Sequence, residues 1–247
     1  FIKEHYNCGC SFLTRNFFKI LFPPLTNFLY HNNQLKPMEP HIKKTIDSYD
    51  KTVKGYIERT DPLYREERVK LFLDLIDQNS DGKEILDMGC AQGRDAEKLV
   101  EKGYNVTGID LSENFIELAR QRVPKAEFKL MDMRKLEFND KKFDGVWASA
   151  SFVHIPKQDL LKTLSEVKRI LKNTGIFYIS VKLGEGDGIK EDPRHENVEK
   201  YWVFFMEEQI KEYLNKAGFE IVDTTSNDSN NKHVDYTWLN LYCKKKN

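Results

Sequence analysis

The sequence predicts an α/β protein with a doubly wound, seven-stranded and mostly parallel sheet. Short apolar runs alternate with amphipathic helical patterns from residue 83 onward. A helix between two strands provides the crossover that parallel pairing requires, and it covers one face of the sheet. The last two apolar runs, 219–225 and 236–243, have no helical pattern between them. We therefore expect these two strands to pair as an antiparallel C-terminal hairpin.

Composition narrows the class of protein. The chain has 247 residues, of which 39 are acidic and 39 are Lys or Arg. Because these charges balance, we expect neither nucleic acid nor a membrane surface as a partner. The four cysteines lack the paired spacing of a zinc site, so we expect free thiols, no metal and a cytoplasmic location. The cysteines are Cys8, Cys10, Cys90 and Cys243.

The N-terminal region differs from the rest of the chain. Residues 12–30 are rich in Phe and Leu, but two adjacent prolines divide them into pieces too short to span a bilayer. An amphipathic anchor, a docking segment and a leader outside the working domain are all compatible with this composition. We favour the leader, and we expect an extension over residues 1–37 followed by the working domain over residues 38–247.

Two amphipathic helices are expected before the first strand. Apolar residues over 41–59 follow helical spacing along one face, and this face includes Tyr49 and Tyr56. A second helical pattern covers residues 64–78 and ends at the polar turn 79–82.

The chain is organised around residues 83–110. A short apolar run leads to Asp87, a turn with a glycine at each end covers 89–93, and a second apolar run ends at Asp110. Glycines let the backbone approach a ligand, and the helix after the turn offers free N–H groups at its N-terminus. An acid at the end of the second strand can accept hydrogen bonds from ribose hydroxyls. This unit predicts a binding site for a molecule that contains adenosine.

The next elements follow in order. Ser112 is a typical N-cap for the helix after Asp110, and Pro156 suits the first position of the helix after the fourth strand. Asp132 and Ser149 each come directly after an expected strand, where ligands bind in such sheets. The third, fourth and fifth strands are expected over residues 126–131, 143–148 and 176–181.

Residues 183–205 interrupt this alternation. Their first part is polar, with three glycines and a proline, and their last part is the aromatic run 201–205. Such a composition favours a surface loop over a core element, so we expect a lid loop here. A helical pattern that ends at Gly218 then leads to the two C-terminal strands.

These motifs resemble those of class I S-adenosylmethionine-dependent methyltransferases, in the branch that acts on small molecules. The resemblance covers residues 38–247 and implies a Rossmann-like methyltransferase fold with S-adenosylmethionine as the cofactor. It rests on five segments, which are Leu86–Gly93, Gly108–Ser112, Met131-Asp132, Phe143–Trp147 and Ala217–Phe219.

The resemblance also implies roles for individual residues. The glycine turn would pack against the methionine part of the cofactor, with Asp87 helping to hold that end. Asp110 matches the residue that binds both ribose hydroxyls, and Asp132 matches the acid near the adenine amino group. Ala91 stands where the family usually has a glycine. The full set expected at the cofactor is Tyr49, Tyr56, Asp87, Gly89, Cys90, Ala91, Gly93, Asp110, Leu111, Asp132, Met133 and Ser149.

His154 is the candidate catalytic residue. It lies just past the fourth strand, and the ordinary pKa of histidine suits proton removal near neutral pH. It could equally hydrogen-bond the loop and hold Pro156 at the helix start. Tyr49 and Tyr56 likewise could close over the sulfonium through ring contacts, or could form only the buried face of their helix. Methyl transfer is an in-line displacement that mainly needs aligned partners and excluded water.

Two rival functions are weighed against methyl transfer to a small molecule. A nicotinamide-dependent oxidoreductase needs three glycines as GxGxxG, whereas only Gly89 and Gly93 stand here, in the wrong register. A cofactor-binding protein of the same fold without methyl-transfer activity is the other alternative, because binding and turnover are different properties. Residues 149–152 lack the Pro-Pro pair of enzymes that methylate amino groups of adenine or glutamine, which favours a small-molecule acceptor.

Overall fold

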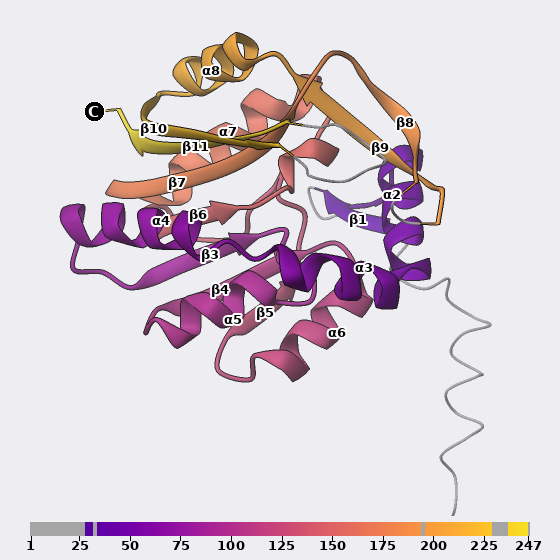
Figure 1. Cartoon of the computed structure of the whole chain (residues 1–247), viewed down its shortest axis with the longest axis horizontal. Coiled ribbons are helices and arrows are strands. Elements are labelled where there is room, and N and C mark those ends of the chain that lie inside the picture. The colour runs from indigo at the N-terminus through magenta and orange to yellow at the C-terminus, as the bar shows by residue number, and fades with distance from the viewer. Residues whose placement is uncertain (1–27, 32–33, 194–195, 229–236, 247) are drawn as a thin grey trace, which may run out of the picture. The chain divides into compact units, whose positions relative to one another are not determined.

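The computed structural model describes residues 28–31, 34–193, 196–228 and 237–246 (Figure 1). The chain divides into two compact units, Phe1–Glu39 and Pro40–Asn247. In the first unit, β1 (Phe28–His31) pairs with β2 (Gln34–Pro37) as an antiparallel hairpin. The rest of the predicted N-terminal extension lies outside the described residues.

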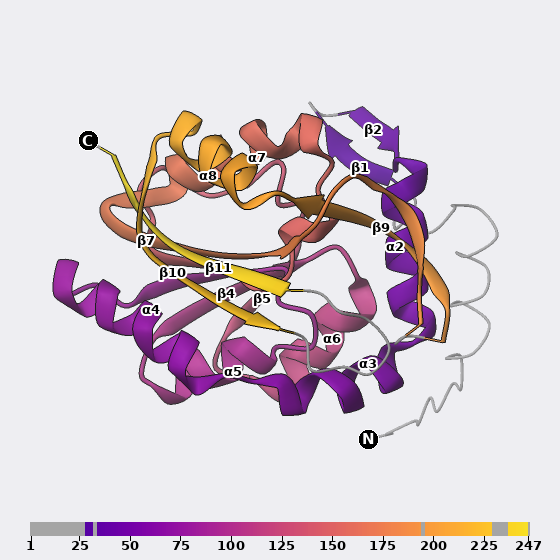
Figure 2. The same cartoon turned by 45° about the horizontal axis from the view of Figure 1, so that its top comes forward.

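The second unit contains the sheet, and its topology confirms the predicted doubly wound fold (Figure 2). Among the described residues the sheet has nine strands rather than the seven predicted, and seven of them lie in the order β10-β11-β7-β6-β3-β4-β5. The pairs β3–β4, β3–β6, β4–β5 and β6–β7 are parallel, whereas β11 pairs antiparallel with both β10 and β7. The strands are β3 (Glu84–Met88), β4 (Asn105–Asp110), β5 (Glu127–Leu130), β6 (Phe143–Ala148), β7 (Leu171–Leu183), β10 (Phe219–Asp228) and β11 (Thr237–Lys245).

Helices cover both faces of this sheet. They are α4 (Glu66–Asn79), α5 (Arg94–Glu101), α6 (Glu113–Arg122), α7 (Lys157–Ile170) and α8 (Glu207–Lys216). Helices α4, α5 and α6 pack on one face, and α7 and α8 pack on the other (Figure 2). Their apolar stripes are fully buried at residues such as Phe72 and Leu164. Removing such side chains from water, at about 25 cal/mol per Å² of apolar area, drives the packing of both layers.

The first predicted helix is divided in two. Helices α2 (Pro40–Lys51) and α3 (Val53–Thr60) meet at Thr52, whose φ of −115° and ψ of 19° lie outside the helical region. The buried Thr52 hydroxyl donates a hydrogen bond of 2.9 Å to the carbonyl of Ser48. Side chains that bond back to the preceding turn often bend a helix, which accounts for the break. A short 3₁₀ helix, η2 (Asp61–Leu63), follows α3.

The prediction of a lid loop over residues 183–205 is wrong, because strands make up most of this segment. β8 (Asp187–Asp192) and β9 (Val198–Phe205) form an antiparallel hairpin, and β9 also pairs in parallel with the end of β7. β8 has the polar composition of a loop because most of its residues are exposed. The aromatic residues of β9 are buried instead, with Trp202 and Phe204 each 5% exposed.

Candidate active site

A cavity lies at the carboxyl ends of β3, β4, β5 and β6, where the predicted site residues were expected. Helices α2 and α3 form its opposite wall through Ile42, Thr45, Ile46, Tyr49 and Tyr56. Predicted residues that line it are Tyr49, Tyr56, Gly89, Ala91, Asp110, Leu111, Asp132, Met133, Ser149 and His154. The predicted residues that lie outside the lining are Asp87, Cys90 and Gly93.

The glycine turn has the left-handed backbone that its sequence predicts. Gly89 has a φ of +83°, and a Cβ added there would lie 2.5 Å from the Cβ of Ser151, so no larger residue fits. Ala91, which replaces the usual glycine, adopts a φ of +46°. A left-handed alanine costs about 1–2 kcal/mol. The hydrogen bond of 3.0 Å from its N–H to Asp110 helps offset this cost.

Asp110 is fixed by backbone donors on both sides. Its Oδ2 accepts from the Ala91 N–H at 3.0 Å, and its Oδ1 accepts from the Ser112 N–H at 2.9 Å. Burial raises the pKa of Asp110, while these N–H groups favour the charged form. A carboxylate oxygen has two lone pairs, so each oxygen can accept a further bond. The predicted N-cap is confirmed as well, because Ser112 Oγ accepts from the Phe115 N–H at 3.1 Å.

Asp132 has a partner that the sequence analysis did not find. Arg134 is 5% exposed and lines the same cavity. Its Nη2 donates to Asp132 Oδ2 at 2.8 Å, and its backbone N–H donates to Oδ1 at 2.8 Å. Arg134 also donates to Asp159 at 3.2 Å. Because guanidinium groups fix the plane of a carboxylate, this pair sets the orientation of Asp132 at the cavity.

Two buried oxygen atoms near the glycine turn have no hydrogen-bond partner among the described residues. One is Oδ2 of Asp87 and the other is Oγ of Ser151. Burial, with the charge of Asp95 nearby, raises the pKa of Asp87 well above its usual range. Ser151 lines the cavity, directly against Gly89. Leaving buried polar atoms unmatched is costly, so both atoms fit a ligand that brings its own polar groups to this end.

His154 uses both ring nitrogens within the protein. Nδ1 lies 2.6 Å from the carbonyl oxygen of Tyr201, which can only accept, so Nδ1 is the donor. Nε2 then accepts from the Tyr49 hydroxyl at 2.8 Å. Burial lowers the pKa of His154 to about 3, and the charges of Lys200 and Lys182 act in the same direction. The imidazole is therefore neutral near pH 7, and these contacts favour the positioning role over the base.

Three aromatic rings meet at the helical wall of the cavity. The Tyr49 and Tyr56 rings lie 5.3 Å apart in an edge-to-face arrangement. Phe115 of α6 lies 5.2 Å from Tyr56 and 5.9 Å from Tyr49. Burial raises the pKa of Tyr56 to about 12, so its hydroxyl stays neutral. Phe115 is 3% exposed, and the tertiary structure brings it to the cavity from α6. Aromatic faces attract cationic groups, including a sulfonium.

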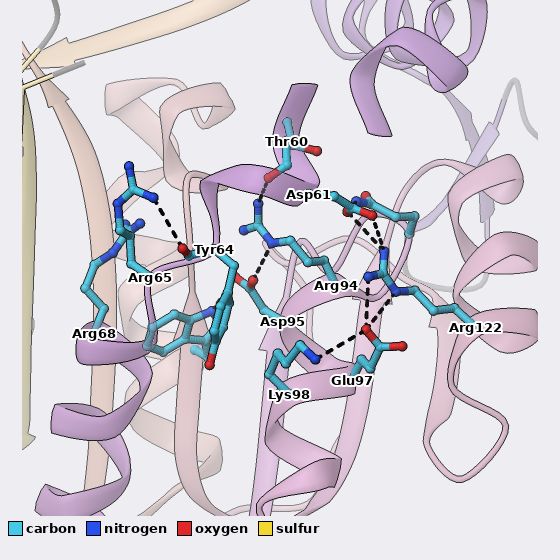
Figure 3. A network of polar contacts seen from close by, with 12 residues as sticks. Thr60, Asp61, Tyr64, Arg65, Arg68, Arg94, Asp95, Glu97, Lys98 and Arg122 are labelled. Carbon is cyan, nitrogen blue, oxygen red and sulfur yellow. Dashed lines mark hydrogen bonds and ion pairs between the residues drawn. The ribbon is translucent and has the colours of Figure 1, made fainter. Parts of the chain in front are cut away.

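A polar network behind the glycine turn joins α3 to the sheet (Figure 3). Arg94 Nη1 donates to the carbonyl of Thr60 at 2.5 Å, and its Nε donates to Asp95 Oδ1 at 2.7 Å. The other oxygen of Asp95 accepts from the indole N–H of Trp147 at 2.9 Å. The Trp147 ring stacks on Tyr178 at 3.8 Å. Arg94 thus links the outer helix α3 to the centre of the fold.

Known proteins are similar to this chain over its central part. A family model described as a methyltransferase domain matches residues 85–175. The methyltransferase GfsG of Streptomyces halstedii is 36% identical over 108 residues, which are 41% of this chain and 38% of that protein. The chain matches 41%, 38% and 34% of three curated relatives, so it spans less than half the length of each.

Solved structures are similar over more of the chain. The crystal structure of a SAM-dependent methyltransferase from Methanosarcina mazei is 25% identical, with a TM-score of 0.62 over 70% of this chain and 97% of that one. The 1,6-didemethyltoxoflavin-N1-methyltransferase of Burkholderia thailandensis was solved with 1,6-didemethyltoxoflavin and S-adenosylhomocysteine bound. It is 20% identical, with a TM-score of 0.62 over 87% of this chain and 93% of that one, and supports the fold.

Proposed function

Because this chain belongs to the class I S-adenosylmethionine-dependent methyltransferases, we propose that it transfers a methyl group from S-adenosylmethionine to a small molecule. The observation that carries this proposal is the carboxylate of Asp110, held by the Ala91 and Ser112 N–H groups at the rim of the cavity. An acid fixed at the end of the second strand is suited to binding the two hydroxyls of a ribose.

In this proposal, different cavity residues contact different parts of the cofactor. Asp110 with Leu111 would bind the ribose, and Asp132 with Met133 would face the adenine. The unmatched oxygen of Asp87 supports a role at the cofactor's ammonium group. The remaining expected contacts are those of Tyr49, Tyr56, Gly89, Ala91 and Ser149, which line the cavity, with Cys90 and Gly93 shaping the turn behind it.

The protein's contribution to the reaction is alignment. The bound cofactor supplies an activated methyl group with a good leaving group. His154 would hold the Tyr49 hydroxyl, and with it the aromatic wall, through the bond of 2.8 Å. Ile42, Ile46 and Ile155 give the cavity an apolar lining that excludes water. In-line displacement needs little beyond this arrangement when the acceptor is already a good nucleophile.

The proposed partner is a small-molecule acceptor, without nucleic acid or membrane. The 39 acidic residues match the 39 Lys and Arg, which gives no general attraction for polyanions. In the described part of the chain, no helix is both long and apolar enough to cross a membrane. Cys90 and Cys243 are buried free thiols, which supports the proposed cytoplasmic location.

Calorimetric titration with S-adenosylhomocysteine tests the proposal, with NADH as the comparison ligand. We expect the wild type to bind S-adenosylhomocysteine in preference to NADH. We expect Asp110→Ala to weaken this binding about tenfold or more, because charged hydrogen bonds to the ribose are lost. Asp140→Ala, which removes a carboxylate paired with Arg169 on the surface, is the control. Preference for NADH, or no binding, would refute the methyltransferase proposal.

Turnover separates the enzyme from a binding protein of the same fold. We expect the wild type, incubated with S-adenosylmethionine and a mixture of small-molecule acceptors, to produce S-adenosylhomocysteine above the uncatalysed rate. Tight binding without any product across the mixture would favour the non-catalytic alternative.

A further inference from the structure

Helix α3, which belongs to the cavity wall, and the 3₁₀ helix η2 after it are weakly embedded in the fold. Neither contributes a buried residue among those described, whereas α2 buries Ile42, Thr45 and Ser48. Yet α3 carries Tyr56, which lines the cavity. Segments with few buried apolar contacts open at low free-energy cost. Besides the ring contacts of Tyr56 with Tyr49 and Phe115, the polar contacts of α3 therefore help to hold Tyr56 in place.

Those polar contacts gather at the C-terminal end of α3 (Figure 3). Arg122 donates to both carboxylate oxygens of Asp61 at 3.0 Å, and Gln92 donates to Asp61 Oδ1 at 2.9 Å. Arg94 donates to the carbonyl of Thr60 at 2.5 Å. We call these five residues, Thr60, Asp61, Gln92, Arg94 and Arg122, the clasp.

The clasp joins the two walls of the cavity. Gln92 belongs to the glycine turn, Arg94 begins α5, and Arg122 ends α6, so all three donors come from the sheet side. Both acceptors come from the helical side, since Thr60 is the last residue of the helix that carries Tyr56 and Asp61 follows it directly. The Thr60 hydroxyl also donates to the carbonyl of Tyr56 at 2.8 Å, so a contact at Thr60 is one helical turn from the cavity.

The chain has breaks on both sides of this segment. Thr52 interrupts the helix before α3, and Tyr64, with ψ of 137°, begins an extended stretch after η2. Hinges are commonly a few residues at element ends that absorb a change in φ and ψ. Thr52 and Tyr64 are therefore the positions suited to act as hinges for residues 53–63.

The ion pair in the clasp is only partly shielded. The Asp61 side chain is 36% exposed and that of Arg122 is 25% exposed, so water competes for both. Gln92, in contrast, is 3% exposed. The clasp thus combines an ion pair that water can reach with a buried amide donor.

We propose that the clasp gates the cofactor cavity, holding α3 and Tyr56 closed and releasing them when the cofactor enters or leaves. This inference rests on the proposed function, since it assigns the gate to the S-adenosylmethionine site. Because the clasp is made by protein groups alone, it forms whether or not the cofactor is bound. Weakening it therefore shifts the open fraction of both states and leaves their difference nearly unchanged.

Stopped-flow binding of S-adenosylhomocysteine to the full chain, as wild type and Asp61→Ala, tests the gate. We expect the association and dissociation rates to rise together, each about fivefold, which is the effect of losing a partly exposed ion pair and its neighbouring hydrogen bond. The dissociation constant then changes by less than about twofold, because the two rates cancel in their ratio. Asp140→Ala is the control, as it removes an ion pair of 2.9 Å with Arg169 outside the clasp.

Hydrogen exchange without any ligand supplies the second measurement. We expect the amides of residues 57–61 and 63 to exchange faster in Asp61→Ala than in Asp140→Ala, with no difference in β3 or β4. A dissociation rate that rises alone would overturn the gate, because it would make the clasp a mere part of the bound state. Unchanged exchange over 57–61 and 63 would overturn it as well. If the wild type binds no S-adenosylhomocysteine, the proposed function fails, and the exchange result alone decides the clasp.

Discussion

The two walls of the cavity are built in different ways. The sheet-side wall consists of strand ends and the turns after them, and backbone bonds fix it, such as that of 2.9 Å from Gly89 N–H to Ile109. The helical wall is held by scattered side chains. Ser48 donates to the carbonyl of Glu199 at 2.6 Å, Thr45 accepts from the Tyr201 N–H at 3.0 Å, and the clasp holds the end of α3.

Because of this difference, the two walls should affect the stability of the fold and the rates of ligand binding to different degrees. Changes in the sheet-side wall disturb a buried parallel sheet, so they act on folding as well as on binding. Changes in the helical wall act on an attachment that is mostly polar and partly exposed, so they act on binding rates and on the choice of acceptor. Variants in the two walls should therefore give opposite patterns of thermal stability and ligand kinetics.

The largest effect is expected where the two walls meet, at Arg94. Its guanidinium lies beside Asp95 at 2.7 Å, and its charge also favours the ionised form of the buried Asp87. We expect Arg94→Gln to destabilise the protein by about 3–5 kcal/mol, because removing one partner leaves a buried charge uncompensated. Chemical denaturation measures this loss.

Lys98→Gln, one turn further along α5, is the matched control. Lys98 pairs with Glu101 at 2.9 Å, but the two side chains are 32% and 54% exposed. We expect a change of less than about 1 kcal/mol there. Equal losses in the two variants would mean that Arg94 is no more than a surface ion pair, and the two walls would then lack a common anchor.

Gly89→Ala tests the rigidity of the sheet-side wall alone. A left-handed alanine costs about 1–2 kcal/mol, and here the new methyl group would also lie 2.5 Å from Ser151 Cβ. Gly103→Ala is the control, because Gly103 has a similar φ of +88° with no described atom within 4 Å of an added Cβ. We expect Gly89→Ala to lose both more stability and more affinity for S-adenosylhomocysteine. Equal effects would mean that the turn can yield, unlike a rigid wall.

The same division explains which parts of the site the sequence predicts. Gly89, Ala91 and Asp110 belong to a local strand–turn–helix–strand pattern, so residue spacing alone placed them at the cavity. Asp87 and Cys90 belong to the same pattern, but the pattern does not reveal that they lie behind the lining. Arg134 and Ser151 gave no local signal, because their positions depend on the packing of separate strands.

The helical wall and its neighbours are less predictable for a physical reason. β8 is mostly exposed, so its composition matches that of a loop, and only pairing with β9 makes it a strand. His154 could be a base or a positioning residue by type. Its neutral state follows from burial and from the charges of Lys200 and Lys182, which are distant in sequence, whereas Tyr201 and Tyr49 fix which ring nitrogen carries the proton.

The variant His154→Gln tests whether the reaction needs His154 as a base. A glutamine amide can donate to the Tyr201 carbonyl and accept from the Tyr49 hydroxyl, so it can preserve the arrangement. We expect kcat to fall by less than about tenfold, whereas loss of a general base typically costs 10² or more. We also expect the pH profiles of kcat/KM for the wild type and the variant to have the same shape near pH 6.5.

The pH dependence of stability gives an independent reading of His154. Its folded pKa is lowered to about 3 from an ordinary value of 6.5, so the unfolded chain binds the proton more readily. The stability that this buried neutral ring contributes is present above pH 6.5 and is lost as the pH falls toward 3. The wild type should therefore lose stability over this window faster than His154→Gln. Parallel curves would indicate an accessible imidazole, and the base would return as the better interpretation.

The smallest effect is expected at Ser151, a sheet-side residue with no described hydrogen-bond partner for its hydroxyl. We expect Ser151→Ala to weaken S-adenosylhomocysteine about three- to tenfold, the range for one neutral hydrogen bond. Binding of 5′-methylthioadenosine, which lacks the amino-acid end, should not change, because Ser151 lies against Gly89 rather than beside Asp110. Titration calorimetry with both ligands measures the difference, with the exposed Ser165→Ala as the control.

Thermal unfolding without ligand completes the Ser151 prediction. Removing an unmatched buried hydroxyl relieves a desolvation cost, so Ser151→Ala should melt at the same temperature as the wild type or slightly higher. A structural hydroxyl would give the reverse pattern, with a lower melting temperature and equal losses for both ligands. If Ser151→Ala raises the melting temperature but weakens binding of S-adenosylhomocysteine, the Ser151 hydroxyl serves the cofactor and slightly destabilises the free protein.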